Sequence, residues 1–239
     1  MDLKGKKVFI TGAARRLGRE MVLHLSNAGC RVTAHYNHSK TEAEALQKET
    51  GCHLFQADFS SIDVNALRRR LDQEVGIADI FISNASSFQR CDFENINEDL
   101  WEQELSINLK VPFFLSQHFG MLMKRKGSGK IIHMTDIAAQ RAYLPYLPYS
   151  IAKAGVVAMT SALARKLAPE VQVNAIAPGT ILFVEDMSEE NREKVLKKIP
   201  AGRTGTVEEF LRTVDFLLSD VDYITGQTLV FDGGRSLTW

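Results

Sequence analysis

The chain has 239 residues, 45% of them hydrophobic, which suits one large α/β domain better than two small ones. Lysine plus arginine and aspartate plus glutamate both number 29, so no basic surplus indicates a nucleic-acid or membrane-surface partner. The three cysteines, Cys30, Cys52 and Cys91, have no metal-ligand spacing, and their odd number argues against a disulfide framework and for a reducing compartment.

Short apolar runs alternate with amphipathic segments along the chain, which predicts strands alternating with helices. The predicted strands are residues 7–10, 31–36, 53–56, 79–83, 130–134, 172–177 and 228–231. The predicted helices are residues 16–28, 41–50, 62–75, 100–126 (bent near Pro112), 149–167, 189–199 and 207–219. This order predicts a single doubly wound Rossmann-type α/β domain over residues 1–239, with a mostly parallel seven-stranded sheet and helices on both faces. In such folds ligands bind at the carboxyl ends of the strands.

The first apolar run follows Lys7, is short and ends at Thr11-Gly12, so we expect no signal peptide. We expect no apolar stretch long enough to span a bilayer. The sequence therefore predicts a soluble, cytoplasmic protein.

A glycine-containing turn, Thr11-Gly-Ala-Ala-Arg-Arg-Leu-Gly18, links the first predicted strand to the first predicted helix. Backbone N–H groups at a helix N-terminus bind phosphate, and glycine lets the phosphate approach the backbone. Many structural turns look similar, so the turn alone is weak evidence. Its position after the first strand favours a nucleotide phosphate.

Tyr149 and Lys153 lie four residues apart in a predicted helix and therefore on one face of it. An ammonium beside a phenol favours the phenolate and lowers its pKa from about 10, which gives a proton donor usable near neutral pH. Tyr36 and Lys40 have the same spacing in a predicted loop, so the spacing alone does not identify a catalytic pair. Asp136 stands thirteen residues before Tyr149, after the strand 130–134.

The order of these motifs carries a resemblance. The motifs are Thr11-Gly-x3-x-x-Gly18, Asn84-Ala85, Asn108, Tyr149-x3-Lys153, Pro178-Gly179 and Asp232-Gly-Gly234. Over its full length the chain resembles the short-chain dehydrogenase/reductase family. Several stretches within it resemble pteridine reductases and dihydromonapterin reductases. These are Thr11 to Gly18, His35-Tyr36, Asn84-Ala-Ser-Ser-Phe88, Asp136 and Glu185-Asp-Met187.

Two departures from the common family pattern are shared with pteridine reductases. Arg16 replaces the middle glycine of the turn, and Asp136 replaces the usual serine. The resemblance implies that Arg16 reaches the cofactor phosphates and the pterin. The alternative for Arg16 is a solvated helix residue, and the alternative for Asp136 is a helix or turn cap.

The cofactor is predicted from residues 34–40, at the end of the second strand, where an NAD site usually has an acid that bonds the ribose hydroxyls. This segment has no acid, and its histidines, serine and Lys40, with Arg15, could surround a 2′-phosphate, which favours NADPH. Asp58 matches a family residue that contacts adenine, and its alternative is a helix N-cap. The predicted cofactor contacts are Gly12, Arg15, Arg16, Leu17, His35, Tyr36, Asn37, His38, Ser39, Asp58, Phe59, Asn84, Ala85, Ser86, Tyr149, Lys153, Pro178 and Gly179.

The resemblance implies hydride delivery from nicotinamide, a proton from Tyr149, and a Lys153 that also holds the nicotinamide ribose. Asn108 would support a water relay, unless it only bonds within its helix. A carboxylate at Asp136 accepts hydrogen bonds, which suits a substrate with N–H groups, and with a raised pKa it could protonate a ring nitrogen. Phe88 could stack on a flat heterocycle, although a lone aromatic is more often a core residue.

Residues 179–188 are apolar and lie between a strand and a helix, so they are either a hydrophobic connector or a lid, and we favour a lid over residues 180–187. The predicted substrate contacts are Arg16, Ser86, Phe88, Asp136, Tyr149, Leu182, Phe183 and Met187. No metal site is expected.

The sequence thus predicts an NADPH-dependent reductase of a pterin or folate-like small molecule, with dihydropterin to tetrahydropterin as the reaction. The alternatives are a general carbonyl or 3-oxoacyl thioester reductase and a non-catalytic NADPH-binding regulatory protein. The resemblance further implies a homotetramer packed through the long helices and the C-terminal segment.

Overall fold

The structure is a computed structural model of the chain and describes residues 1–184 and 187–238. Its strands are β1 Lys7–Ile10, β2 Arg31–Tyr36, β3 His53–Gln56, β4 Ile80–Ser83, β5 Gly129–Met134, β6 Val171–Pro178 and β7 Thr228–Phe231. Its α-helices are α1 Arg16–Asn27, α2 Lys40–Thr50, α3 Val64–Glu74, α4 Glu98–Leu105, α5 Val111–Lys126, α6 Leu147–Leu167, α7 Glu189–Leu196 and α8 Val207–Asp215. The strand bounds agree with the predicted ones to within one residue.

The strands form one sheet in the order β3-β2-β1-β4-β5-β6-β7, and every neighbouring pair is parallel. The predicted Rossmann-type domain is confirmed, with an all-parallel sheet in place of a mostly parallel one. The strand order reverses beside β1, where Ile10 pairs with Ala34 on one side and with Ile82 on the other. Such a reversal opens a crevice at the carboxyl ends of the strands, so the topology itself places a ligand site there.

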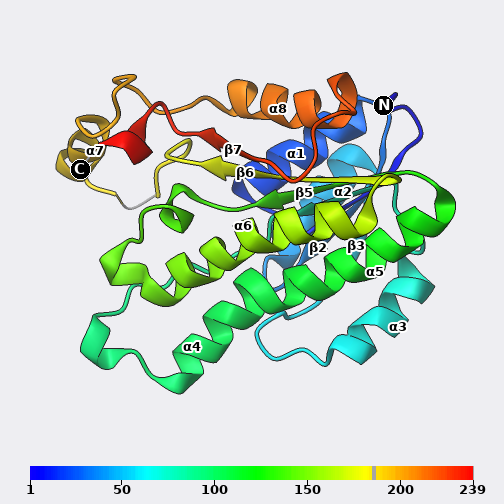
Figure 1. The fold of residues 1–239 in the computed structure, drawn as a ribbon, viewed down its shortest axis with the longest axis horizontal. Helices are drawn as coiled ribbons and strands as arrows, with labels where there is room; N and C mark the ends of the chain where they lie inside the picture. Colours follow the sequence, from blue (N-terminus) through cyan, green and yellow to red (C-terminus); the bar gives the residue numbers. More distant parts are fainter. Residues whose placement is uncertain (185–186, 239) are drawn as a thin grey trace.

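Side chains alternate across the sheet and bury apolar surface on both faces. Val8 and Ile10 pack into one core with Met21 of α1 and Phe210 of α8. On the opposite face Phe9 packs with residues of α3, α5 and α6. In Figure 1, α4, α5 and α6 run together along one side of the sheet, and α1 and α8 lie along the other. This burial on both faces explains why the strands read as short apolar runs rather than as alternating patterns.

The predicted helix 100–126 is divided into three parts. It begins at Glu98, where the side chain of Asn97 accepts the backbone N–H of Leu100 at 2.9 Å. A π-helical turn, Ser106–Lys110, separates α4 from α5. The bend expected near Pro112 is replaced by this turn, because Pro112 falls in the first turn of α5, where its missing N–H is tolerated.

The segment Leu144–Leu167, which includes α6, is long and apolar enough to cross a membrane by length and composition, contrary to our expectation that no stretch would be. More than half of its most apolar window is buried inside the domain, however, and α6 packs against β6 and α5. Such a segment is weak evidence for a membrane span, since the central helix of an α/β domain meets the same criteria.

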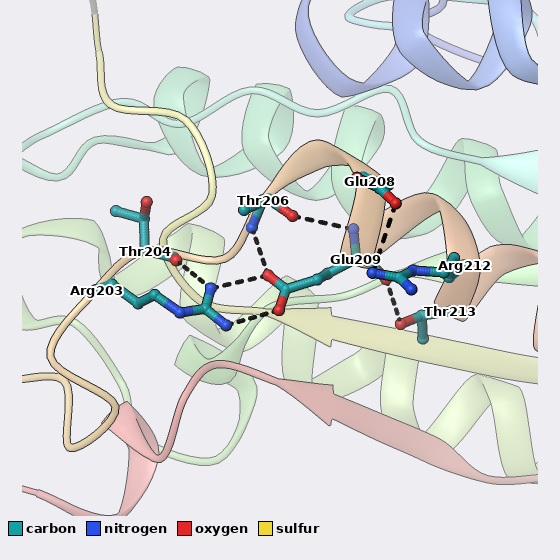
Figure 2. Close-up of polar contacts among 7 residues, drawn as sticks. All are labelled: Arg203, Thr204, Thr206, Glu208, Glu209, Arg212 and Thr213. Carbon is teal, nitrogen blue, oxygen red and sulfur yellow. Dashed lines mark hydrogen bonds and ion pairs between the residues drawn. The ribbon is translucent and has the colours of Figure 1, made fainter.

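The N-terminus of α8 is fixed by a reciprocal pair of hydrogen bonds (Figure 2). Thr206 Oγ1 accepts the backbone N–H of Glu209 at 3.1 Å, and the Glu209 carboxylate accepts the N–H of Thr206 at 2.9 Å. Both Glu209 oxygens also accept from the Arg203 guanidinium, at 2.6 and 2.8 Å. This arrangement satisfies helix N–H groups that would otherwise lack partners, and it anchors the segment that follows α7.

Replacing the capping residue should destabilise the domain without disturbing its site. Thr206→Ala removes the acceptor for the Glu209 N–H and should lower the free energy of unfolding by about 1 kcal/mol. The measurement is the urea midpoint at constant m-value. Thr204→Ala, two residues before the cap, is the matched control. Equal midpoints for the two variants would contradict the role assigned to the cap.

Candidate functional site

A cavity of about 580 Å³ opens at the carboxyl ends of the central strands. Most of the predicted site residues line it: Gly12, Arg15, Arg16, Leu17, His35, Tyr36, Asn37, His38, Ser39, Phe59, Asn84, Ala85, Ser86, Phe88, Asp136, Tyr149, Lys153, Pro178, Gly179 and Leu182. The predicted residues Asp58, Asn108, Phe183 and Met187 are not among the lining residues. Gly18, the last residue of the predicted glycine turn, also lines it, together with five residues that were not predicted: Ala14, Ile107, Met134, Thr135 and Ile181.

The turn between β1 and α1 is closely packed against the loop after β4. A Cβ on Gly12 would lie 2.7 Å from Ala85 Cα, and one on Gly18 would lie 2.1 Å from the Gly12 oxygen. Asn84 Nδ2 donates to the carbonyls of Thr11 and Gly12, at 3.0 and 2.9 Å. These contacts leave no room for side chains and hold the turn at the N-terminus of α1. The turn therefore fits a phosphate group held by backbone N–H groups.

Arg16 occupies the left-handed backbone region, with φ 52°, where the family pattern has glycine. Its guanidinium donates to the carbonyl oxygens of Leu182 at 2.8 Å and Phe183 at 3.2 Å. Arg16 is exposed and is the first residue of α1, as the alternative of a solvated helix residue requires, but its guanidinium also has these two carbonyl partners. Arg16 joins the phosphate turn to the start of the predicted lid. Two residues of the predicted lid that also belong to the resemblance, Glu185 and Asp186, lie outside the described residues.

His35 does not supply positive charge to a phosphate. It is buried, its Nδ1 accepts the N–H of Gly12 at 3.1 Å, and its Nε2 therefore carries the proton that bonds the Ala57 oxygen at 3.0 Å. Its ring stacks on Phe59 with centroids 4.0 Å apart. Burial lowers the pKa of His35 to about 4, so the ring is neutral at pH 7. This corrects its predicted role: His35 supports the turn from behind.

Near the end of β2, the exposed basic side chains that line the cavity and could reach a 2′-phosphate are Arg15 and His38. Lys40 is the first residue of α2, pairs with Glu44 at 3.7 Å and does not line the cavity. The alternative for Asp58 as a helix N-cap is wrong, since Asp63 caps α3. Asp58 instead accepts the backbone N–H of Ser60 at 2.8 Å, which lowers the pKa of its carboxyl.

Tyr149 and Asp136 are in direct contact. The Tyr149 hydroxyl donates to Asp136 Oδ2 at 2.8 Å, while Asp136 Oδ1 accepts the N–H of Ala138 at 2.7 Å. The turn-cap alternative for Asp136 is therefore correct for one oxygen, and the other faces the candidate catalytic tyrosine. Lys153, one helical turn from Tyr149, is buried and donates from Nζ to the Met134 oxygen at 2.9 Å.

The protonation states differ from the expectation for the tyrosine. Burial, followed by the Asp136 charge, raises the pKa of Tyr149 well above its ordinary value instead of lowering it. Burial also raises the pKa of Asp136, as a proton-donating role would require. Burial lowers the pKa of Lys153 to about 8. At neutral pH the phenol therefore keeps its proton and Lys153 is largely an ammonium. A phenol that holds its proton this tightly is a weaker general acid than the one expected from the Tyr149–Lys153 spacing.

Phe88 is not a core residue, because it lines the cavity and is 48% exposed. Its ring stacks on Tyr146 with centroids 3.8 Å apart and meets Tyr149 edge-on at 4.7 Å. Tyr146 was missed by the sequence analysis and lies just before α6. Phe88 and Tyr149 both line the cavity, and Tyr146 supports the Phe88 ring without lining it, so the cavity has an aromatic surface that suits a flat substrate.

Asn108 lies in the π-helical turn and is buried behind the cavity. Its Oδ1 accepts from Ser86 Oγ at 2.7 Å, and its Nδ2 donates to Ser87 and to Glu104 Oε2 at 3.0 Å. The bond to Glu104 lies within the helical segment, as the alternative for Asn108 expected. The bonds with Ser86 and Ser87 reach the loop after β4, so Asn108 does not bond only within its helix. Its role in a water relay stays a prediction. Glu104 was also missed; its one sequence signal is an acid four residues before Asn108.

Comparison with known proteins shows the family. A family model described as enoyl-(acyl carrier protein) reductase matches residues 12–236. The chain belongs to the short-chain dehydrogenase/reductase family. This oxidoreductase family accounts for the glycine turn, the Tyr149–Lys153 pair and the position of the cavity together.

Relatives within the family divide into two groups. The 3-oxoacyl-[acyl-carrier-protein] reductase FabG of Staphylococcus aureus is 34% identical over 96% of this chain and 97% of its own, and the acetoacetyl-CoA reductase of Rhizobium meliloti is 32% identical over 95% and 96%. Among solved structures, FolM alternative dihydrofolate reductase 1 from Brucella canis, complexed with NADP, has a TM-score of 0.91 at 30% identity and covers 100% of this chain and 96% of that one. The Brucella suis FolM complex gives 0.90 at 30% identity over 100% and 98%.

The Arg16 contacts predict a measurable effect on the lid. Arg16→Ala should free the carbonyls of Leu182 and Phe183, so amide hydrogen exchange in residues 180–184 should become at least several-fold faster in the cofactor-free protein. Arg15→Ala, its exposed neighbour, is the control. Unchanged exchange in Arg16→Ala would show that the lid is held by other contacts.

Proposed function

We propose that the protein is an NADPH-dependent reductase of a pterin or folate-like substrate, and that dihydropterin to tetrahydropterin is its reaction. The observation that carries this proposal is the carboxylate of Asp136 in contact with the Tyr149 hydroxyl at 2.8 Å. A serine at this place would donate to a substrate carbonyl, whereas a carboxylate accepts from N–H groups. A pterin edge presents such groups, and Phe88 offers a flat apolar surface beside them.

The cavity suits NADPH in three ways. The phosphate turn has the closely packed Gly12 and Gly18, and its guanidinium, Arg16, stands at the helix N-terminus. No acid follows β2, and the exposed Arg15 and His38 could hold a 2′-phosphate. The FolM structures similar to this chain contain NADP. When bound, the cofactor supplies hydride, and the rest of the chemistry belongs to this chain.

The residues around the reacting centre divide the work. Tyr149 holds a proton on its hydroxyl at neutral pH, because burial and the Asp136 charge raise its pKa. Lys153 places a positive charge beneath the Tyr149 ring, 5.4 Å from its centroid, and by family resemblance would hold the nicotinamide ribose. Asp136 orients the N–H groups of the substrate or, when protonated, supplies a proton to a ring nitrogen. Leu182 closes the cavity from the lid side.

A second candidate function is the reduction of 3-oxoacyl thioesters. It is favoured by the FabG and acetoacetyl-CoA reductase relatives. Asp136 argues against it, because that reaction needs a donor to a carbonyl oxygen. The connected Asp136, Tyr149 and Lys153 also argue against a non-catalytic NADPH-binding protein. The deciding experiment measures NADPH oxidation with dihydrobiopterin, dihydromonapterin, dihydrofolate and an acetoacetyl thioester in parallel, and turnover of the thioester alone would overturn the pterin assignment.

We also propose a cytoplasmic homo-oligomer, a tetramer by family resemblance. Large apolar side chains on α5 and α6 support it: Phe113, Met121 and Ile151 are 39%, 42% and 48% exposed. Within the described residues, no group of three or more His, Cys, Asp or Glu side chains is placed to hold a metal ion.

Removing the phenol oxygen should stop proton transfer. Tyr149→Phe keeps the ring that Phe88 contacts and should lower kcat by about 10²–10⁴-fold. NADPH affinity, measured by fluorescence, should stay within about twofold, since the ring and Lys153 remain. Substantial turnover by Tyr149→Phe would show that the proton comes from another group.

Changing the acid at residue 136 should alter substrate preference. Asp136→Ser keeps a side chain that can cap the turn at Ala138 but replaces the acceptor with a donor. We expect kcat/KM for a dihydropterin to fall by up to about 10⁴-fold, with an activated ketone much less affected, and one limb of the pterin pH profile to disappear. Asp136→Asn, which keeps the shape, is the matched control. An equal fall for both substrates would make Asp136 purely structural.

A further inference from the structure

A buried carboxylate, Glu104, lies next to the site without belonging to the cavity wall. It is only 1% exposed, in α4, and no ion pair with it is found in the part of the chain that the structure describes. An apolar residue at such a position would ordinarily give a folded domain of at least equal stability, because burying a carboxylate has a large desolvation cost. Its presence therefore needs an explanation from its contacts.

Neutral donors surround this carboxylate. Ser87 Oγ donates to Oε1 at 2.7 Å, and Asn108 Nδ2 donates to Oε2 at 3.0 Å. The backbone N–H of Gln89 bonds to it as well. Burial raises the pKa of Glu104, while these bonds oppose the rise. Both oxygens are thus bonded, and the acceptor-only form of the group is the one that the contacts favour.

The contacts fix two parts of the site. Since Asn108 Nδ2 points to Glu104, Asn108 Oδ1 must face Ser86 Oγ, which donates to it at 2.7 Å. Ser87 and Gln89 flank Phe88, the residue whose ring lines the cavity. One carboxylate therefore sets the amide orientation of Asn108 and holds the loop on both sides of the Phe88 ring.

The charge of Glu104 also acts on the catalytic residues. It opposes the lowering of the Lys153 pKa, as does the charge of Asp136, and it contributes to the raised pKa of Tyr149. The charge of Lys153 also acts on His133, which is buried and neutral because burial lowers its pKa to about 3. Among the residues that the structure describes, Glu104 and Asp136 are therefore the negative groups that act on this ammonium.

We propose that Glu104 is a positioning residue of the active site: it orients Asn108 and the loop carrying Phe88, and its negative charge stabilises the Lys153 ammonium. This inference rests on the proposed function in one respect: the roles of Lys153 and Tyr149 in turnover come from that proposal. The geometry and the charge can be tested without turnover.

Three variants separate geometry from charge. In Glu104→Gln the amide oxygen can still accept from Asn108, and the amide nitrogen can donate to Ser87 Oγ, because a hydroxyl can accept as well as donate. This variant loses the charge and keeps the shape. Glu104→Ala loses both. Glu102→Gln removes an exposed acid two residues away in the same helix and is the matched control.

The first readout is the protonation of Lys153 in the cofactor-free protein, followed by NMR of ¹³Cε-labelled lysine and assigned with Lys153→Ala. Loss of a nearby negative charge lowers the pKa of an ammonium. The midpoint, about 8 in the unmodified protein, should therefore fall by about half a pH unit, or roughly threefold in proton affinity, in Glu104→Gln and stay constant in Glu102→Gln. An unmoved midpoint in Glu104→Gln overturns the inference, even if the variant is less stable.

The second readout is turnover with whichever substrate the unmodified protein reduces fastest. Glu104→Gln should shift the alkaline limb of kcat/KM to lower pH with KM nearly unchanged, whereas Glu104→Ala should also raise KM by about tenfold, because Phe88 is no longer held in place. Equal KM values in the two variants would overturn the positioning of the loop. A moved lysine midpoint without any NADPH oxidation by the unmodified protein would overturn the proposed function and support the inference.

Discussion

The active-site region depends on the attachment of α6 to the carboxyl end of β5. Lys153 Nζ donates to the Met134 oxygen at 2.9 Å, Thr135 Oγ1 donates to the Lys153 carbonyl at 2.9 Å, and Tyr149 donates to Asp136. The two bonds of Lys153 are buried, where an unsatisfied ammonium would be costly, and the Tyr149–Asp136 bond is partly buried. Sliding of α6 along the sheet would therefore break several bonds at once. The relative positions of phenol, carboxylate and ammonium follow from this one attachment.

The opposite wall of the cavity depends on close backbone approach. Gly12 contacts Ala85, while His35 of β2 and Asn84, just after β4, bond the turn from either side. The closely packed turn holds the Arg16 backbone in the left-handed region, which is strained for a residue with a side chain. The site thus combines a fixed turn with a guanidinium whose bonds to the lid are exposed and easily exchanged for others.

Much of this was predictable from the sequence, since parallel strands read as apolar runs and the motifs stand in a fixed order along the chain. Side-chain environments were less predictable. His35 reads as a phosphate ligand until its two backbone partners are known, and Tyr149 reads as acidified by Lys153 until its contact with Asp136 is known. Glu104 and Tyr146 gave almost no signal, because their roles depend on contacts with the loop after β4, which only the fold reveals. Periodicity reports which face of an element is buried, and it says nothing about partners across the sheet.

The pairing of β1 with β4 has a consequence for how the chain folds. Ile10 pairs with Ile82. β1 leads into the glycine turn and β4 leads into the loop that contacts this turn. The two strands can therefore pair only when the long segment between them is available to form the intervening loop. Contacts between residues distant in sequence form slowly, because a large loop must be closed first. The turn therefore gains Asn84 and Ala85 late, and a nucleotide that needs both sides binds only chains in which this central pairing is complete. Such a ligand would stabilise the finished sheet by mass action and leave earlier, partly folded chains exposed to degradation.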